Sequence, residues 1–188
     1  MDEKQVLKKL RDTNALLSGH FLLRSGLHSD KYFQAALVLQ HTRIAEELCS
    51  ALAATFKGTP IDTVISPAVG GIVVGQEVGR ACGVRAVFAE KDGDGGLVLR
   101  RGFRLEPGEN VLVAEDVVTR GGRVQQTIDL VRAAGANVAG VAVLVDRSGG
   151  QAEFGVPLHS LVKLQLTTYR PEECPLCKAG KPLEKPGS

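Results

Sequence analysis

Apolar residues recur along the chain with two periods, one typical of helices and one typical of strands. Five of them near the start fall roughly on one helical face: Val6, Leu7, Leu10, Leu16 and Leu17. This spacing predicts an opening helix over residues 3–18, and apolar side chains four positions apart predict another over residues 42–57. Between the two, GHFLLRSGLHSDKYFQ predicts a hairpin around a Ser-Gly turn.

The middle of the chain alternates short apolar runs with helical patterns. Residues 62–66 and 85–89 predict core strands, and the helical stretch between them ends near Cys82. After the glycine-rich loop KDGDGG, the run LVLRRGF predicts an exposed strand and EPGE a turn. The clearest unit follows, with VLVAED as a strand, VVTRGGR as a loop and VQQTIDLVRAAG as a helix that closes on glycine. The run VAGVAVLVDR then predicts a further buried strand.

This alternation predicts an α/β fold with a mostly parallel twisted sheet flanked by helices and joined by right-handed crossovers. All 188 residues are expected to form a single domain. In such folds, ligands bind outside the carboxyl ends of the strands. The functional residues are therefore expected in the loops that follow the strands.

Composition narrows the class of protein without choosing a function. Hydrophobic residues make up 44% of the chain, which is enough for a core and argues against disorder. A net charge of +2 gives no case for nucleic acid or a membrane surface as partner, and no apolar run approaches the roughly 20 residues of a transmembrane helix. The charged start MDEKQVLKKLRD is unlike a secretory signal, and two of the four cysteines stand alone in apolar stretches, so a cytoplasmic protein is expected.

The strand end at residues 115–116 combines acids with a glycine loop. Glu115 and Asp116 are suited to accept hydrogen bonds from vicinal sugar hydroxyls or to support a bound metal. The loop that follows offers backbone N–H groups, a hydroxyl, two positive charges and a helix N-terminus to a phosphate. An ordinary strand–turn–helix with solvated acids is the alternative, and the segment is neither a Walker loop nor a G-x-G-x-x-G.

The segment VLVAEDVVTRGGR resembles the signature of type I phosphoribosyltransferases for phosphoribosyl pyrophosphate (PRPP). In that family an apolar strand precedes two acids, two apolar residues and Thr-Thr-Gly-Gly-Ser or similar, and Arg120 and Arg123 replace small or hydroxyl residues here. The resemblance implies a small N-terminal hood (1–40), a PRPP-binding core (60–150), a mobile catalytic loop and a C-terminal tail (170–188). It implies PRPP binding by Glu115, Asp116, Val117, Val118, Thr119, Arg120, Gly121, Gly122 and Arg123, with Asp116 also catalytic.

The hairpin resembles the N-terminal signature of orotate phosphoribosyltransferases, Phe-x-Leu-(Lys/Arg)-Ser-Gly followed by Ser-x-x-(Phe/Tyr)-Phe. This signature is filled by Phe21, Leu23, Arg24, Ser25, Gly26, Ser29, Tyr32 and Phe33. By resemblance, Arg24 lies near PRPP and orotate, while Tyr32 and Phe33 border the planar base. The resemblance also implies that Arg147, in VLVDR, binds the orotate carboxylate and that Thr119 contacts orotate.

Two further loops resemble parts of the same family. The segment PAVGG at residues 67–71 resembles its pyrophosphate-binding loop, without the Tyr-Lys pair of longer relatives. FAEK followed by DGDGGLVLRRGF resembles the mobile loop of a shorter bacterial subtype, in which only Lys91 aligns. Lys91 is thereby implied to be catalytic, binding the departing pyrophosphate of PRPP in the neighbouring subunit's site of a homodimer. Arg100, Arg101 and Arg104 are alternative sources of charge, or simply cations on an exposed strand.

The tail contains Cys174-Pro-Leu-Cys177, which is half of a zinc-ribbon pattern. It has no partner pair, and the four histidines, at positions 20, 28, 41 and 159, show no ligand spacing along the chain. The sequence therefore favours a structural role without a metal and leaves metal binding open. Mg²⁺ is the expected cofactor, held through PRPP with no direct side-chain ligand.

The implied reaction joins orotate to PRPP, giving orotidine 5′-monophosphate and pyrophosphate on the route to UMP. Two alternatives remain, a purine or pyrimidine-salvage phosphoribosyltransferase and a non-catalytic regulator that senses PRPP. The Arg-Ser-Gly hairpin speaks against the first alternative. The near-neutral charge and the lack of an appended nucleic-acid module speak against the second.

Overall fold

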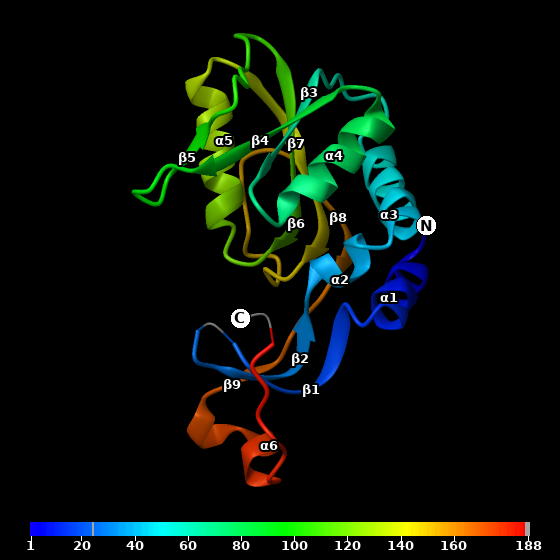
Figure 1. The fold of residues 1–188 in the computed structure, drawn as a ribbon, viewed down its shortest axis with the longest axis vertical. Coiled ribbons are helices and arrows are strands. Elements are labelled where there is room, and N and C mark those ends of the chain that lie inside the picture. Colours follow the sequence, from blue (N-terminus) through cyan, green and yellow to red (C-terminus); the bar gives the residue numbers. More distant parts are fainter. Residues whose placement is uncertain (24, 187–188) are drawn as a thin grey trace.

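A computed structural model describes residues 1–23 and 25–186 and has a six-stranded sheet at its centre (Figure 1). The strand order is β5-β4-β3-β6-β7-β8, and every neighbouring pair is parallel except β4 with β5. The strands are β3 (Thr63–Pro67), β4 (Arg85–Lys91), β5 (Leu97–Leu99), β6 (Asn110–Val118), β7 (Asn137–Asp146) and β8 (Leu158–Lys163). The helices are α1 (Glu3–Asp12), α2 (Ala35–Leu39), α3 (Thr42–Ala54), α4 (Gly71–Cys82) and α5 (Gly122–Ala133).

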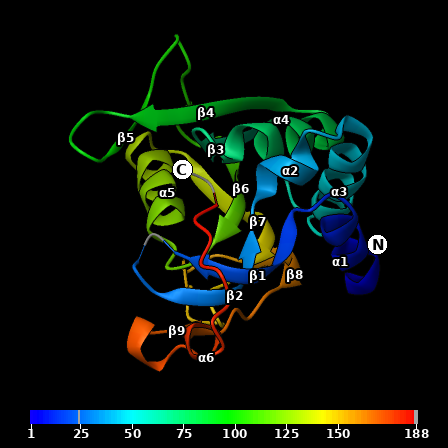
Figure 2. The same ribbon diagram turned by 60° about the horizontal axis from the view of Figure 1, so that its bottom comes forward.

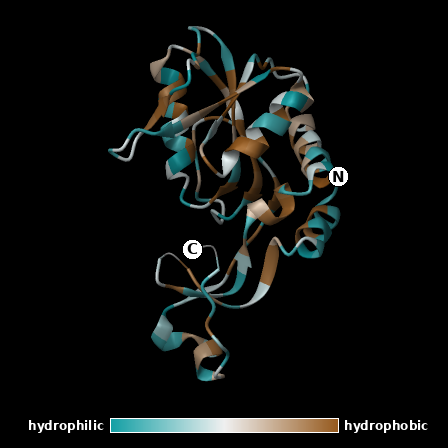
Figure 3. Cartoon of the chain, in the orientation of Figure 1, coloured by the Kyte–Doolittle hydropathy of each residue, from teal (hydrophilic) through white to brown (hydrophobic). Residues whose placement is uncertain are grey.

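Helices cover both faces of this sheet, with α3 and α4 on one side and α5 on the other (Figure 1). Alternate side chains of β6 pack against the helices on the two faces of the sheet, because successive side chains of a strand point to opposite faces. Leu112 and Ala114 belong to the hydrophobic cluster under α3 and α4, whereas Val111 and Val113 belong to the cluster under α5. Figure 3 shows the apolar residues concentrated on the central strands and hydrophilic residues on the outer helices. The predicted α/β fold is confirmed.

A second, smaller sheet forms the hood from both ends of the chain. Its order is β1-β2-β9, with β1 (Leu16–Leu22), β2 (His28–Phe33) and β9 (Thr168–Tyr169) all antiparallel. After β9 come η1 (Pro171–Glu173) and α6 (Pro175–Lys178). Glu184 then forms an isolated parallel β-bridge with Phe21 of β1. The hood therefore includes the C-terminal tail, which the sequence had separated from it. Figures 1 and 2 show the hood on the side toward which β6 points.

Two element boundaries differ from the sequence expectation by four residues or more. The opening helix ends at Asp12, because Asn14 takes a positive φ of 55° and the chain then enters β1, so Leu16 and Leu17 are strand residues. The strand expected over residues 97–103 stops at Leu99, because Arg101 has a φ of 58° and a turn follows. No helix in residues 1–23 and 25–186 has both the length and the apolar character to cross a membrane.

Candidate active site

Glu115 and Asp116 lie near the carboxyl end of β6, next to the loop that begins α5. Glu115 is buried, with 7% of its surface exposed, and Asp116 is half-buried. The backbone N–H of Asp116 donates to Glu115 Oε1 at 3.1 Å. Burial raises the pKa of both carboxyl groups, and the charge of Asp116 raises the pKa of Glu115 further. These acids are therefore not the solvated surface groups of the structural alternative.

The loop between β3 and α4 packs directly against this acid pair. A Cβ at Gly70 would lie 2.8 Å from Asp116 Oδ2, and a Cβ at Gly71 would lie 2.8 Å from Glu115 Oε1. Any other residue at either position would have to displace these carboxyl groups, so glycine allows the loop to approach them closely. The loop that resembles a pyrophosphate site and the acids that resemble a ribose site are thus brought together.

The loop between β6 and α5 carries the expected phosphate site. Gly121 has a φ of 78°, and a Cβ there would lie 2.9 Å from the ring of Phe154. Gly122 begins α5, and a Cβ there would meet open space. The first N–H groups of this 12-residue helix have no helical partner and favour an anion. Val118 at the end of β6 is a core residue whose carbonyl accepts a hydrogen bond from the Arg147 N–H at 2.8 Å.

A hollow of about 290 Å³ lies at the ends of β6 and β7. Among the described residues the buried Nε of Arg147 has no hydrogen-bond partner. Burial lowers the pKa of Arg147, and the phenol of Tyr32 acts in the opposite direction. An unpartnered buried polar group costs about 1–3 kcal/mol, so an acceptor on a ligand would be stabilised there. The lining residues are Thr119, Arg120, Arg147, Ser148 and Gln151.

The sequence placed Thr119 and Arg147 at one site, and the structure brings both to this hollow. Ser148 and Gln151 were missed by the sequence reasoning. Their position directly after Arg147, in the polar segment SGGQ, was the available signal. A polar, glycine-containing loop at a strand end is where ligand contacts concentrate in α/β folds.

The two aromatic residues of β2 have different environments, because neighbouring strand residues face opposite sides. Phe33 is only 6% exposed and packs in the α3–α4 cluster with Leu10 and Leu48. It cannot border a base as expected. Tyr32 is half-buried, with its ring 5.8 Å from that of Phe21, and remains the candidate. Arg24, which was expected near PRPP, lies outside the described residues.

Arg123 and Arg120, the departures from the family signature, have separate environments. Arg123 Nη1 donates to Gln126 Oε1 at 2.9 Å and to the Gly95 carbonyl at 3.3 Å. Arg123 therefore ties α5 to the glycine-rich loop, and Gln126 adds a second bond to the same carbonyl at 3.2 Å. Arg120 is exposed and lines the hollow beside Arg147.

Lys91 is exposed at the end of β4, and β3 separates its strand from β6. The loop that follows is organised by Asp92, whose Oδ1 accepts from the N–H groups of Asp94 and Gly96, both at 2.9 Å. Arg101 pairs with Glu90 at 2.9 Å, and its guanidinium carbon lies 5.7 Å from the centre of the Phe88 ring. The charge of Arg101 is therefore used locally, whereas Lys91, Arg100 and Arg104 are all exposed and remain candidates for the lid cation.

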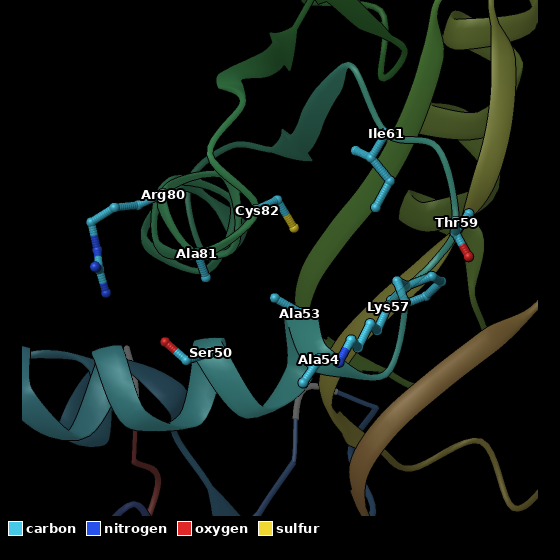
Figure 4. A pocket seen from close by; sticks show the side chains of 10 residues that line it. Ser50, Ala53, Ala54, Lys57, Thr59, Ile61, Arg80, Ala81 and Cys82 are labelled. Atoms are coloured by element: carbon cyan, nitrogen blue, oxygen red, sulfur yellow. The ribbon is translucent and has the colours of Figure 1, made fainter.

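A larger hollow of about 570 Å³ lies between the carboxyl-terminal ends of α3 and α4 (Figure 4). It is lined by Ala54, Ile61 and Cys82 among others. Because Ile61 comes just before β3, this hollow lies near the amino-terminal ends of the strands, whereas the acids lie near the carboxyl end of β6. Its Arg80 pairs with Glu77 at 2.9 Å. Since strand carboxyl ends bind ligands in this architecture, we assign the active site to the smaller hollow.

Known proteins resemble this chain in sequence over its whole length. A family profile described as the phosphoribosyl transferase domain matches residues 35–154. The orotate phosphoribosyltransferase of Pelotomaculum thermopropionicum is 52% identical over 188 residues, covering 100% of this chain and 98% of that protein. The one from Caldanaerobacter subterraneus is 53% identical, with coverage of 100% and 98%.

Solved structures give the same picture of the fold. The orotate phosphoribosyltransferase from Aeropyrum pernix matches with a TM-score of 0.72 and 25% identity, over 85% of this chain and 93% of that chain. An adenine phosphoribosyltransferase from Thermoanaerobacter pseudethanolicus has a TM-score of 0.63 and 21% identity, over 71% and 88% of the two chains. The fold is therefore shared by enzymes that act on different bases.

Proposed function

The chain belongs to the orotate phosphoribosyltransferases, and we propose that it transfers the phosphoribosyl group of PRPP to orotate, giving orotidine 5′-monophosphate and pyrophosphate on the route to UMP. The observation that carries the choice of base is the Arg147 guanidinium, whose Nε has no partner among the described residues and which lines the hollow with Thr119. Orotate is a flat carboxylate, and a guanidinium binds a carboxylate with two parallel hydrogen bonds.

The PRPP site is proposed around the end of β6. Glu115 and Asp116 would accept hydrogen bonds from the ribose hydroxyls, and the N-terminus of α5 would hold the 5′-phosphate. The Gly70–Gly71 turn supports a neighbouring pyrophosphate site, because its backbone lies against the acids with no side chain between them. Arg120, exposed beside Arg147, adds positive charge for the phosphates of PRPP.

Mg²⁺ is proposed as the cofactor, held mainly by PRPP oxygens and water. The residues fit this ion, since the buried Glu115 and the half-buried Asp116 at the end of β6 offer the oxygen donors that it prefers. When bound, Mg²⁺ neutralises charge on the pyrophosphate. The strand-end acids would then lie in its outer coordination sphere, without bonding to it directly.

The chain itself supplies positioning and charge, without a covalent nucleophile. Pyrophosphate leaves the anomeric carbon of the ribose with the bonding electron pair, and a ring nitrogen of orotate bonds to that carbon and releases its N–H proton to pyrophosphate or water. Arg147 and Thr119 orient the base, Asp116 holds the ribose, and Lys91 balances the charge of the leaving group. We further propose that Lys91 reaches the partner's site in a homodimer, because it is exposed on the β4–β5 hairpin. A cytoplasmic location suits the four free cysteines.

The decisive experiment compares orotate with uracil, which lacks the carboxylate, in an assay with PRPP and Mg²⁺. Orotate should react and uracil should react at least about 100-fold more slowly, because losing a charge-assisted bidentate contact costs several kcal/mol. Arg147→Ala should lower kcat/KM for orotate by a similar factor while PRPP affinity, measured by calorimetry, changes little. Arg132→Ala, on an exposed position in the last turn of α5, is the matched control.

Equal turnover of orotate and uracil by the wild type would reject the assignment to orotate. Turnover of a purine in place of orotate would favour the salvage alternative, whose members share this fold. Tight PRPP binding with no turnover of any base would favour the sensing regulator.

A further inference from the structure

Four metal-binding side chains from the two ends of the chain meet inside the hood. His20 lies on β1 and His28 on β2, while Cys174 and Cys177 flank the start of α6. Their potential ligand atoms all lie within 4.8 Å of one another. Along the sequence the histidines and cysteines are about 150 residues apart, with separations of 154 for Cys174–His20 and 149 for Cys177–His28.

The spacing of these atoms matches a tetrahedral metal site. His20 Nε2 lies 3.0 Å from His28 Nδ1, 3.5 Å from Cys174 Sγ and 3.6 Å from Cys177 Sγ. Cys177 Sγ lies 3.3 Å from His28 Nδ1. Zinc–sulfur and zinc–nitrogen bonds of the usual length, arranged tetrahedrally, place two nitrogens about 3.3 Å apart and a nitrogen and a sulfur about 3.6 Å apart. Small shifts suffice to admit the ion.

A second contact prepares His20 to be a ligand. Its Nδ1 lies 2.9 Å from the Lys181 carbonyl oxygen, which is an acceptor only, so Nδ1 carries the proton. The lone pair of Nε2 therefore faces the cluster. Metal-bound histidines usually donate their other ring N–H to such an oxygen, which fixes the tautomer and the ring orientation.

Burial adds to the case. His20 is 3% exposed, His28 5% and Cys174 0%, whereas Cys177 is exposed and leaves a way in for the ion. Part of the hood also lies outside the main apolar core. Phe21 and Cys174 are buried there but belong to neither of the two hydrophobic clusters of the described residues. Small sheets with little apolar contact commonly depend on a metal or a disulfide.

We propose that His20, His28, Cys174 and Cys177 bind one Zn²⁺ per chain as a structural site. Two thiolates and two imidazoles favour zinc over the oxygen-binding ions, and four protein ligands leave no open position for substrate. The ion joins the β1–β2 hairpin to the tail, alongside the hydrogen bonds from Glu184 N–H to the His20 carbonyl and from Leu22 N–H to the Glu184 carbonyl, both 2.8 Å. The site is separate from the Mg²⁺ site and does not rest on the proposed function.

The first test measures zinc in the tag-free full chain after gel filtration, by elemental analysis. We expect about one zinc per chain in the wild type. Cys177→Ser and His28→Ala should each lose most of it, and their Tm should fall by roughly 5 °C or more because binding energy is folding energy. Cys82→Ser and His41→Ala are the matched controls, since both lie outside the cluster, and they should keep the full zinc content.

The second test uses the wild-type fold and so does not depend on the variants folding. Reduced protein stripped of metal should bind one Co²⁺ and develop the intense visible bands of tetrahedral cobalt together with thiolate charge-transfer bands. Zinc should then displace the cobalt. Absence of zinc together with absence of these bands would overturn the proposal and leave a hydrogen-bonded cluster. Zinc retained by both Cys177→Ser and His28→Ala would overturn it equally.

Discussion

At the level of single residues, burial gives ordinary side chains unusual properties at this site. Arg147 keeps a buried Nε without a partner among the described residues, and Glu115 is an acid held in a buried strand end. Both arrangements cost stability in the free protein. Both are compensated when a ligand supplies the missing acceptor or donor, so the strain of the free site favours substrate binding.

The raised pKa of Glu115 gives a stability test that needs no substrate. Burial and the charge of Asp116 raise the pKa of this carboxyl in the folded state. Its stabilising contribution is therefore fully present below the unfolded value, about 4.3, and is lost as pH rises through the folded value. The Tm of the wild type should therefore decline as pH rises from about 4.3 to about 9, and the Tm of Glu115→Gln should decline less. Glu153→Gln, at an exposed position, is the control and should follow the wild type.

The same acids should matter for PRPP. Glu115→Gln and Asp116→Asn should each weaken PRPP binding by about tenfold, because an amide can place an NH₂ donor where an acceptor oxygen should face a ribose hydroxyl, and an unsatisfied buried polar group costs about 1–3 kcal/mol. Calorimetry with Mg²⁺ present measures the affinity. Unchanged affinity in both variants would place the ribose elsewhere.

At the level of elements, the β6–loop–α5 unit joins the acids to a helix N-terminus. The two glycines of its loop have different physical roles. Gly121 requires its positive φ and close contact with Phe154, whereas Gly122 has free space around it. A substitution at Gly121 is therefore expected to affect both protein stability and phosphate binding. A substitution at Gly122 is expected to affect phosphate binding with little effect on stability.

Gly121→Ala should lower Tm, because it adds strain at positive φ and a clash with the Phe154 ring. Gly122→Val should keep the wild-type Tm within a few degrees yet weaken PRPP binding by about tenfold, since its side chain obstructs the helix N-terminus. Thermal unfolding and calorimetry on the same samples distinguish the outcomes. Full PRPP affinity in Gly122→Val would argue against phosphate binding there.

At the level of the whole molecule, the hood is built from both ends of the chain and lies on the side of the core toward which β6 points (Figure 2). Tyr32 of the hood acts to raise the pKa of Arg147 of the core, so the proposed base site involves both parts. The β4–β5 hairpin with Lys91 is at the other edge of the main sheet and ends in a loop tied to α5 through Arg123. The exposure of Lys91 and the resemblance of its loop to the family's mobile loop are the reasons for the proposed shared site.

A mixing experiment tests the shared site. Lys91→Ala and Asp116→Asn homodimers should both be poorly active, and exchange of subunits should restore activity, because each mixed dimer has one site with neither change. Random exchange makes about half of the dimers mixed, so recovery should approach about a quarter of the wild-type rate. A tagged pull-down confirms exchange. No recovery after confirmed exchange would mean that Lys91 acts within its own subunit or not at all.

The sequence by itself determined the α/β core and located the candidate PRPP half of the site. The strand, loop and helix from Asn110 to Ala133 were predictable because the apolar period, the glycines and the strand-end acids are contiguous. The boundaries failed where a single backbone angle decided them, at Asn14 and at Arg101. Such angles are local events that hydrophobic period does not encode.

Only the tertiary structure decided which distant side chains meet. It buried Phe33 in the core, set Gly70 and Gly71 against the acids, and left Arg147 Nε without a partner among the described residues. It also closed the hood with His20 and Cys174 side by side, although no spacing along the chain links them. The physical reason is common to all of these. Contacts across many residues follow from how whole elements pack, and packing is a property of the assembled sheet and its layers.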